Sequence, residues 1–150
     1  MTNKLQLCIM ARKVLFIGLV WPEPTSSAAG TRIIQLVELF LANGDELHFA
    51  SAASKSDFSF DLSSLGVKEH SIVLNHHSFD TWVTALNPDI IVYDRFMIEE
   101  QYGWRVQQHC PNCLRILDTE DLHFLRYARQ QALKRNEAVN LINDVTKREI

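Results

Sequence analysis

The chain alternates between short apolar runs and segments in which apolar residues recur every three or four positions. The apolar runs are rich in β-branched residues, and their nearly continuous hydrophobicity is typical of strands in a parallel sheet that is covered on both faces. We expect five such strands, at residues 14–20, 46–50, 71–74, 89–93 and 114–117.

The segments between these runs have helical features. A helix is expected after the first strand, because Ile33, Val37 and Phe40 share one helical face. Two further helices, at residues 78–86 and 98–109, each end just before a proline. Together with a helix after the last strand, the order β-α-β-β-α-β-α-β-α predicts an α/β fold. We expect a Rossmann-like open parallel sheet with helices on both faces.

Length and composition narrow the classes of function. A chain of 150 residues that is 47% hydrophobic suits one domain, which can bury about two-thirds of its unfolded surface. The net charge of −3 and the absence of a basic stripe argue against a nucleic-acid partner. No apolar run approaches the length of a transmembrane segment, and no signal peptide is evident, so a cytoplasmic protein is expected. We assign residues 1–12 to an N-terminal extension and 13–150 to the Rossmann-like domain.

The loop at residues 21–30 joins the first strand to its helix at the edge where open α/β sheets bind ligands. Small residues such as Ala29 and Gly30 let a ligand approach the backbone, and the N–H groups of a helix amino end favour an anion. Arg32 adds a positive charge in the first turn. The glycine spacing of a dinucleotide motif and the lysine of a P-loop are both absent. A plain connection closed by a serine or threonine cap is the alternative.

A second polar stretch follows the fifth strand. Its carboxylates are Asp118, Glu120 and Asp121. The simplest interpretation is that Asp118 or Thr119 caps the next helix, while Glu120 and Asp121 complement its dipole. A magnesium or manganese site is the weaker alternative, and no metal is expected, because consecutive helical residues point in different directions. Capping leaves His123 and Arg126 unexplained.

Other polar residues carry weaker signals. Cys110 and Cys113 have redox-motif spacing, but they end a helix instead of starting one, so reduced thiols are expected. Glu99 lies in an acidic helix start on the same edge, where binding and a favourable helix dipole are equally good explanations. Large aromatic side chains are expected in the core and not on a sugar-stacking surface: Phe79, Trp82 and Trp104.

Three segments together resemble a known family. They are AAGTRI after the first strand, DRFMIEEQYGW after the fourth, and LDTEDLHFLR after the fifth. The last is similar to a D-x-x-D-L-H-x-x-R pattern of that family. From residue 13 onward, the chain resembles the N-terminal half of a glycosyltransferase with the GT-B fold, close to family 4 of the retaining enzymes.

The resemblance implies the acceptor-side domain of an enzyme that moves a sugar from a nucleotide-sugar donor to an acceptor hydroxyl, without a further cofactor. Asp121 and His123 would be catalytic and face the reacting groups. Donor or acceptor contacts would come from Ala29, Gly30, Arg32, Glu99, Glu120 and Arg126.

Such an enzyme needs a second, donor-binding domain. The chain ends within a continuing helical pattern at residues 146–150. We therefore expect a truncated piece, or one that a separate subunit completes, with no activity alone. The alternative is a non-catalytic Rossmann-like module that binds a ligand or a partner.

Overall fold

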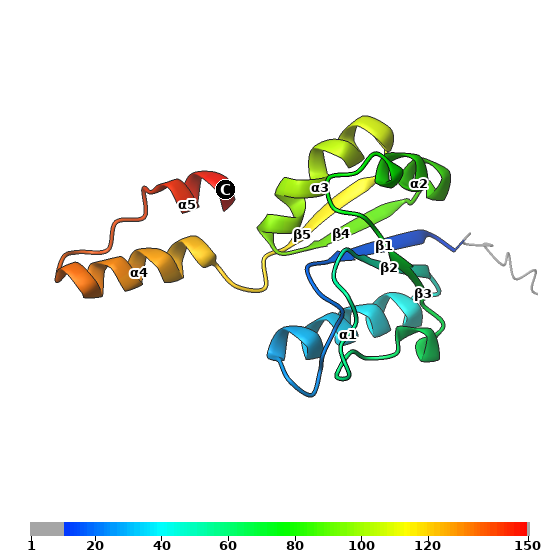
Figure 1. The fold of residues 1–150 in the computed structure, drawn as a ribbon, viewed down its shortest axis with the longest axis horizontal. Helices are drawn as coiled ribbons and strands as arrows, with labels where there is room; N and C mark the ends of the chain where they lie inside the picture. Colours follow the sequence, from blue (N-terminus) through cyan, green and yellow to red (C-terminus); the bar gives the residue numbers. More distant parts are fainter. Residues whose placement is uncertain (1–10, 150) are drawn as a thin grey trace, which may run out of the picture.

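The computed structural model describes residues 11–149, which contain a five-stranded sheet (Figure 1). Its strands are β1 (Lys13–Gly18), β2 (Glu46–Ser51), β3 (Lys68–Ser71), β4 (Ile90–Asp94) and β5 (Leu114–Asp118). They lie in the order β3-β2-β1-β4-β5, and every neighbouring pair is parallel. The predicted Rossmann-like open sheet is confirmed, with β1 at its centre.

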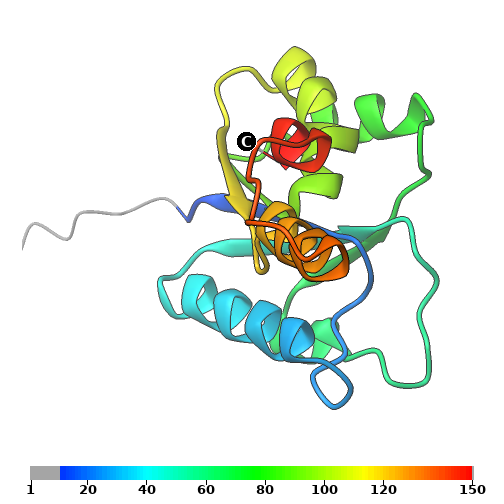
Figure 2. The same cartoon turned by 90° about the vertical axis from the view of Figure 1, so that its left-hand side faces the viewer.

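Helices cover both faces of the sheet. They are α1 (Ala28–Ala42), the 3-10 turn η1 (Leu62–Leu65), α2 (Ser78–Leu86), α3 (Phe96–His109), α4 (His123–Arg135) and α5 (Asp144–Glu149). One face carries α1 and η1, and the other carries α2 and α3 (Figure 1). α4 and α5 project from the end of the sheet at which the strands finish (Figure 2).

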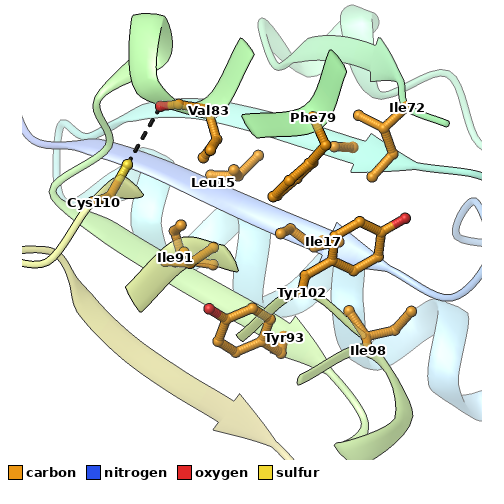
Figure 3. Close-up of a cluster of buried hydrophobic side chains, with 12 residues drawn as sticks. Leu15, Ile17, Ile72, Phe79, Val83, Ile91, Tyr93, Ile98, Tyr102 and Cys110 are labelled. Carbon is orange, nitrogen blue, oxygen red and sulfur yellow. Dashed lines mark hydrogen bonds between the residues drawn. The ribbon is translucent and has the colours of Figure 1, made fainter. Parts of the chain in front are cut away.

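The central strand separates two hydrophobic cores. Leu15 and Ile17 pack with α2 and α3 in one core, part of which is shown in Figure 3. Val14 and Phe16 pack with α1 in the other. All four side chains are buried. A strand that is covered on both faces does not alternate between polar and apolar residues. Its position can therefore be predicted from a run of apolar residues alone.

Two strands differ from the sequence prediction. β1 ends at Gly18 and not at residue 20, because the chain turns away from the sheet after that glycine. β3 occupies Lys68–Ser71 and not residues 71–74. It lies at the edge of the sheet and carries polar side chains, so an apolar run does not mark it.

The large aromatic residues divide between core and surface. Phe79 and Trp82 pack in the core, as predicted. Trp104 was expected there as well, but it is 58% exposed, and the Arg105 guanidinium lies 4.9 Å from its ring centroid. Trp104 falls on the face of α3 that points away from the sheet, which its hydrophobicity alone does not reveal.

The two cysteines among the described residues are free thiols. Cys110 is buried, and its thiol lies 3.5 Å from the Val83 carbonyl oxygen (Figure 3). Burial raises the pKa of both the Cys110 and the Cys113 thiol. Since the thiolate is the reactive form, this pair has the character of packing residues.

Residues 1–10 lie outside the part of the chain that the structure describes, and with them most of the expected N-terminal extension. Within residues 11–149, no helix combines the length and the apolar character needed to cross a membrane.

A series of polar contacts joins β2 to β3. His48 is buried, with Nε2 2.9 Å from Glu46 Oε1 and Nδ1 2.8 Å from His70 Nε2. A carboxylate only accepts, so His48 donates from Nε2, and His70 then donates from Nε2 to His48 Nδ1. Lys68 also donates to Glu46, and the His70 ring packs against Trp82. Burial lowers the pKa of both imidazoles and so favours their neutral forms, although the Glu46 hydrogen bond offsets part of the shift at His48.

We predict that the protein loses stability as the pH falls from 7 to 5. Burial lowers the pKa of His48 and His70, so the unfolded chain binds more protons below about pH 6.5. The charges of Lys68 and, for His48, Lys13 act in the same direction. The pKa of Glu46 is lowered to about 2 by Lys68 and His48, so this carboxylate stays ionised throughout the window. Urea unfolding at pH 5, 6 and 7 measures the decline.

Two variants test whether the buried histidines cause this loss of stability at low pH. His70→Phe keeps an aromatic ring against Trp82 but cannot titrate, so it should lose less stability than the wild type over the same pH range. His76→Gln removes an exposed loop histidine and should keep the wild-type slope. Equal slopes in all three proteins would show that the buried pair does not control the pH dependence.

Candidate functional site

The strand order creates a crevice at the carboxyl end of the sheet. β1 and β4 are neighbours, but the chain leaves β1 for α1 on one face and β4 for α3 on the other. Ligands of open α/β sheets bind at such a switch point. Charged side chains gather here from the segments that follow β1, β4 and β5.

An ion pair links the start of α1 to the end of β5. Arg32 donates from Nε to both oxygens of Asp118, at 3.2 and 3.0 Å, and from Nη2 to Oδ1 at 2.8 Å. Asp118 is buried, whereas half of the Arg32 side chain is exposed. These bonds raise the pKa of Arg32. The predicted site residue Arg32 is therefore at the crevice, but its guanidinium is held by Asp118.

A second charged group surrounds Arg95, which has a φ of 76°. Such a conformation costs about 1–3 kcal/mol in a residue other than glycine and is concentrated at functional sites. It brings Arg95 Nε to 3.3 Å from Asp94 Oδ1 and 3.5 Å from Glu120 Oε2. The Arg95 backbone N–H also donates to the Asp118 carbonyl oxygen at 2.8 Å. Glu120 is thus part of the crevice, as predicted.

Asp94 is a functional candidate that the sequence analysis missed. Its carboxyl is buried at the end of β4, accepts a bond from the Leu19 N–H at 3.4 Å, and has a pKa raised by burial. A buried carboxyl with a perturbed pKa in a crevice is a common feature of functional sites. The sequence does contain a feature that indicates Asp94. The charged pair Asp94-Arg95 directly follows the apolar run of β4 and so lies at the same edge as the polar stretches after β1 and β5.

The small residues of the loop at residues 21–30 make contacts within that loop. The Ser27 hydroxyl caps α1 by accepting from the Gly30 N–H at 3.0 Å, as the structural alternative predicted. A Cβ at Gly30 would collide with the backbone of Glu23, so this glycine makes room for its own chain. Ala29 lines a hollow of about 20 Å³ between the loop and Asp94, room for about one water.

The amino end of α4 is capped from α5, and the expectation that Asp118 caps it is wrong. Glu149 accepts from the His123 N–H at 3.0 Å and from the Phe124 N–H at 2.7 Å. α4 begins only at His123, and the turn before it contains Glu120 with a φ of 53°, so Asp118 faces Arg32 instead.

Asp121, His123 and Arg126 lie together at this helix end. Asp121 Oδ2 forms an ion pair with Arg126 Nη1 at 2.6 Å. His123 Nδ1 is 3.0 Å from the Asp121 carbonyl oxygen. Because a carbonyl only accepts, a neutral His123 carries its proton on Nδ1 and presents Nε2 as an acceptor. The backbone of Asp121 thereby positions the imidazole.

A cavity of about 510 Å³ opens beside His123. Aromatic, apolar and basic side chains share its walls, chief among them Phe96, Met97, His123, Arg126, Tyr127 and Arg148. The volume is within the range of small-molecule sites. Two of the predicted site residues, His123 and Arg126, therefore border a hollow that can admit a ligand.

Glu99 lies away from the crevice. Its carboxylate lies over Gly103 of α3 and lines a hollow beside β5, on the α3 face of the sheet. Glu99 was expected on the same edge as Arg32, but the structure does not bring the two residues together. Within residues 11–149, no group of three or more His, Cys, Asp or Glu side chains is arranged to hold a metal ion.

Comparison with protein-family models and with curated proteins found no match to this chain. The interpretation of the crevice therefore rests on its own contacts. Those contacts separate into a charged group around Asp118 and a histidine-bearing cavity at the start of α4.

We predict that Arg32→Ala lowers the free energy of unfolding by about 2 kcal/mol, because it leaves the buried Asp118 carboxylate without its partner. Arg126→Ala is the matched control. It also removes an arginine from an ion pair, but both partners are solvent-accessible, so the loss should be below about 0.5 kcal/mol. Urea denaturation of both variants at pH 7 tests this, and equal losses would contradict the structural role of the Arg32–Asp118 pair.

Proposed function

We propose that this protein is the acceptor-side domain of a GT-B glycosyltransferase, which acts together with a donor-binding domain. The observation that supports this best is the contact between the three segments that carry the resemblance. Arg32 of AAGTRI bonds Asp118 of LDTEDLHFLR, and Arg95 of DRFMIEEQYGW donates to the Asp118 carbonyl and approaches Glu120. Segments far apart in the sequence form one unit at the ligand-binding edge.

The chemistry of glycosyl transfer suits these residue types. Positive charge develops on the anomeric carbon, and negative charge develops on the departing diphosphate. In this proposal, His123 Nε2 accepts a hydrogen bond from the acceptor hydroxyl and so orients it or takes its proton. Arg32 and the amino end of α1 lie on the side of the leaving diphosphate. The cavity beside His123 holds the acceptor.

A non-catalytic binding module is the second candidate. It is favoured by the hydrogen bonds that the charged groups already form within the chain. Asp118 accepts hydrogen bonds from Arg32, and Glu149 accepts hydrogen bonds from the amino end of α4. A ligand at either position has to compete with the chain's own carboxylate. A module that binds its partner or ligand at another surface does not need Arg32 or the amino end of α4 to be available.

We predict that the chain alone binds UDP-glucose and GDP-mannose no better than in the millimolar range. The nucleotide contacts of a GT-B enzyme come mainly from the donor-binding domain, and a few hydrogen bonds at an open edge do not offset the cost of immobilising a ligand. Calorimetry measures the affinity. Micromolar binding of either compound would favour the binding module over the acceptor-side domain.

A second measurement addresses the acceptor side directly. A panel of mono- and disaccharides and alkyl glycosides, titrated into ¹⁵N-labelled protein, should include a compound that shifts the His123 ring nitrogens and the amides of residues 121–127. His123→Ala should weaken that binding about tenfold or more, the loss of one well-placed hydrogen bond, whereas the loop variant His77→Ala should not. A panel without any such compound would argue against the acceptor-side assignment.

A further inference from the structure

A hollow of about 620 Å³ lies on the α3 face of the sheet beside β5, outside the crevice described above. We call it the Tyr93 hollow. Apolar and polar side chains line it, chief among them Tyr93, Glu99, Cys113, Leu114, Arg115 and Leu117. It has the size of a small-molecule site and is open to solvent at the edge strand.

The hydroxyl of Tyr93 is the strongest indication that this hollow binds a ligand. Tyr93 is 1% exposed, and among the described residues its hydroxyl has no hydrogen-bond partner. Figure 3 shows the ring on the α3 face, with the hydroxyl directed toward β5. A buried hydroxyl without a partner is costly, and such a group calls for an explanation. The neighbouring Tyr102 hydroxyl is also unpartnered, but it does not line the hollow.

Glu99 brings a carboxylate to the same hollow. Its neighbour Glu100 is held by Arg148 through two hydrogen bonds, of 2.9 and 2.7 Å. Glu99 itself forms no ion pair within residues 11–149; it lies over Gly103, where a larger residue would displace it. Proximity to the Glu99 carboxylate contributes to the raised pKa of Tyr93, after burial and the nearby Cys113. The hollow is thus lined by a carboxylate and by a tyrosine hydroxyl that both lack partners among the described residues.

The remaining lining residues restrict the charge of the ligand. Arg115 donates from Nη1 to Gln107 Oε1 at 3.2 Å, and its guanidinium has further N–H groups to offer. Arg148 and Glu149 line the hollow as well. An anionic ligand would therefore face Glu99 and Glu149, and a cationic one would face Arg115 and Arg148. A neutral hydroxyl can donate to the carboxylate, accept from the guanidinium and do either with Tyr93. Leu114 and Leu117 supply an apolar surface for a C–H face.

We propose that the Tyr93 hollow is a binding site for a neutral saccharide or polyol, held by Tyr93, Glu99 and Arg115 against the side chains of β5. This site does not depend on the proposed function, because neither His123 nor the Asp118 group lines it. Arg148 is the residue that it shares with the cavity beside His123.

The test uses three glucose derivatives that are neutral, cationic and anionic. ¹⁵N-labelled chain is titrated with methyl α-D-glucopyranoside, glucosamine and glucuronate, and with maltose and myo-inositol as further neutral probes. A neutral probe should give saturable shifts at the amides of Tyr93, Glu99 and residues 113–117, and it should bind at least fivefold more tightly than the charged analogues. Tighter binding of either charged analogue would overturn the proposal, as would shifts confined to residues 19–32 and 121–127.

Two conservative variants separate binding from folding. Tyr93→Phe should weaken the neutral probe at least tenfold and leave the Tm unchanged or raised, because the hydroxyl makes no bond within the described protein. Glu99→Gln should weaken binding at least fivefold, while Glu38→Gln, an exposed carboxylate on α1, should not. Unchanged affinity in Tyr93→Phe, or a Tm lowered by several degrees, would overturn the proposal.

Discussion

The ion pair between Arg32 and Asp118 holds the carboxyl edge of the sheet together, although its members are 86 positions apart in the chain. A buried carboxylate is stable only with a partner, and Arg32 supplies three hydrogen bonds to Asp118 while keeping half of its own surface in water. The same strand end binds the Arg95 backbone, whose positive φ turns its side chain toward Asp94 and Glu120. The edge is therefore ordered before any ligand arrives.

This order has an electrostatic consequence. Asp118 lies against Arg32, and Glu149 lies at the amino end of α4. At both places a carboxylate of the chain already meets the positive potential that attracts an anion. A phosphate that enters the crevice must therefore displace a carboxylate that is already bound there. Neutral or hydroxyl-bearing ligands face no such competition. The edge is therefore better suited to a neutral, hydroxyl-bearing ligand than to a phosphate, which agrees with the acceptor side proposed above.

Buried elements were predictable from the sequence, and exposed or distant contacts were not. β1, β2 and β4 have both faces covered, so their composition alone marks them. The edge strand β3 carries only polar side chains and lies three residues before its predicted position. The site stretches after β1 and β5 were found from their positions. Asp94 was missed although it follows a strand in the same way, and Glu149 caps a helix 26 positions away, which no local pattern encodes.

The two hollows share a wall, and that wall is α5. Arg148 borders both the cavity beside His123 and the Tyr93 hollow, and Glu149 borders the latter while it caps α4. A helix of six residues does not persist alone in water. Its position depends on the Glu149 cap, on the bonds from Arg148 to Glu100 and on the approach of Arg148 to the Phe96 ring. A ligand that displaced Arg148 from one hollow would therefore alter the wall of the other. Ligand binding at the two proposed sites would then be coupled through the docking of a single short helix.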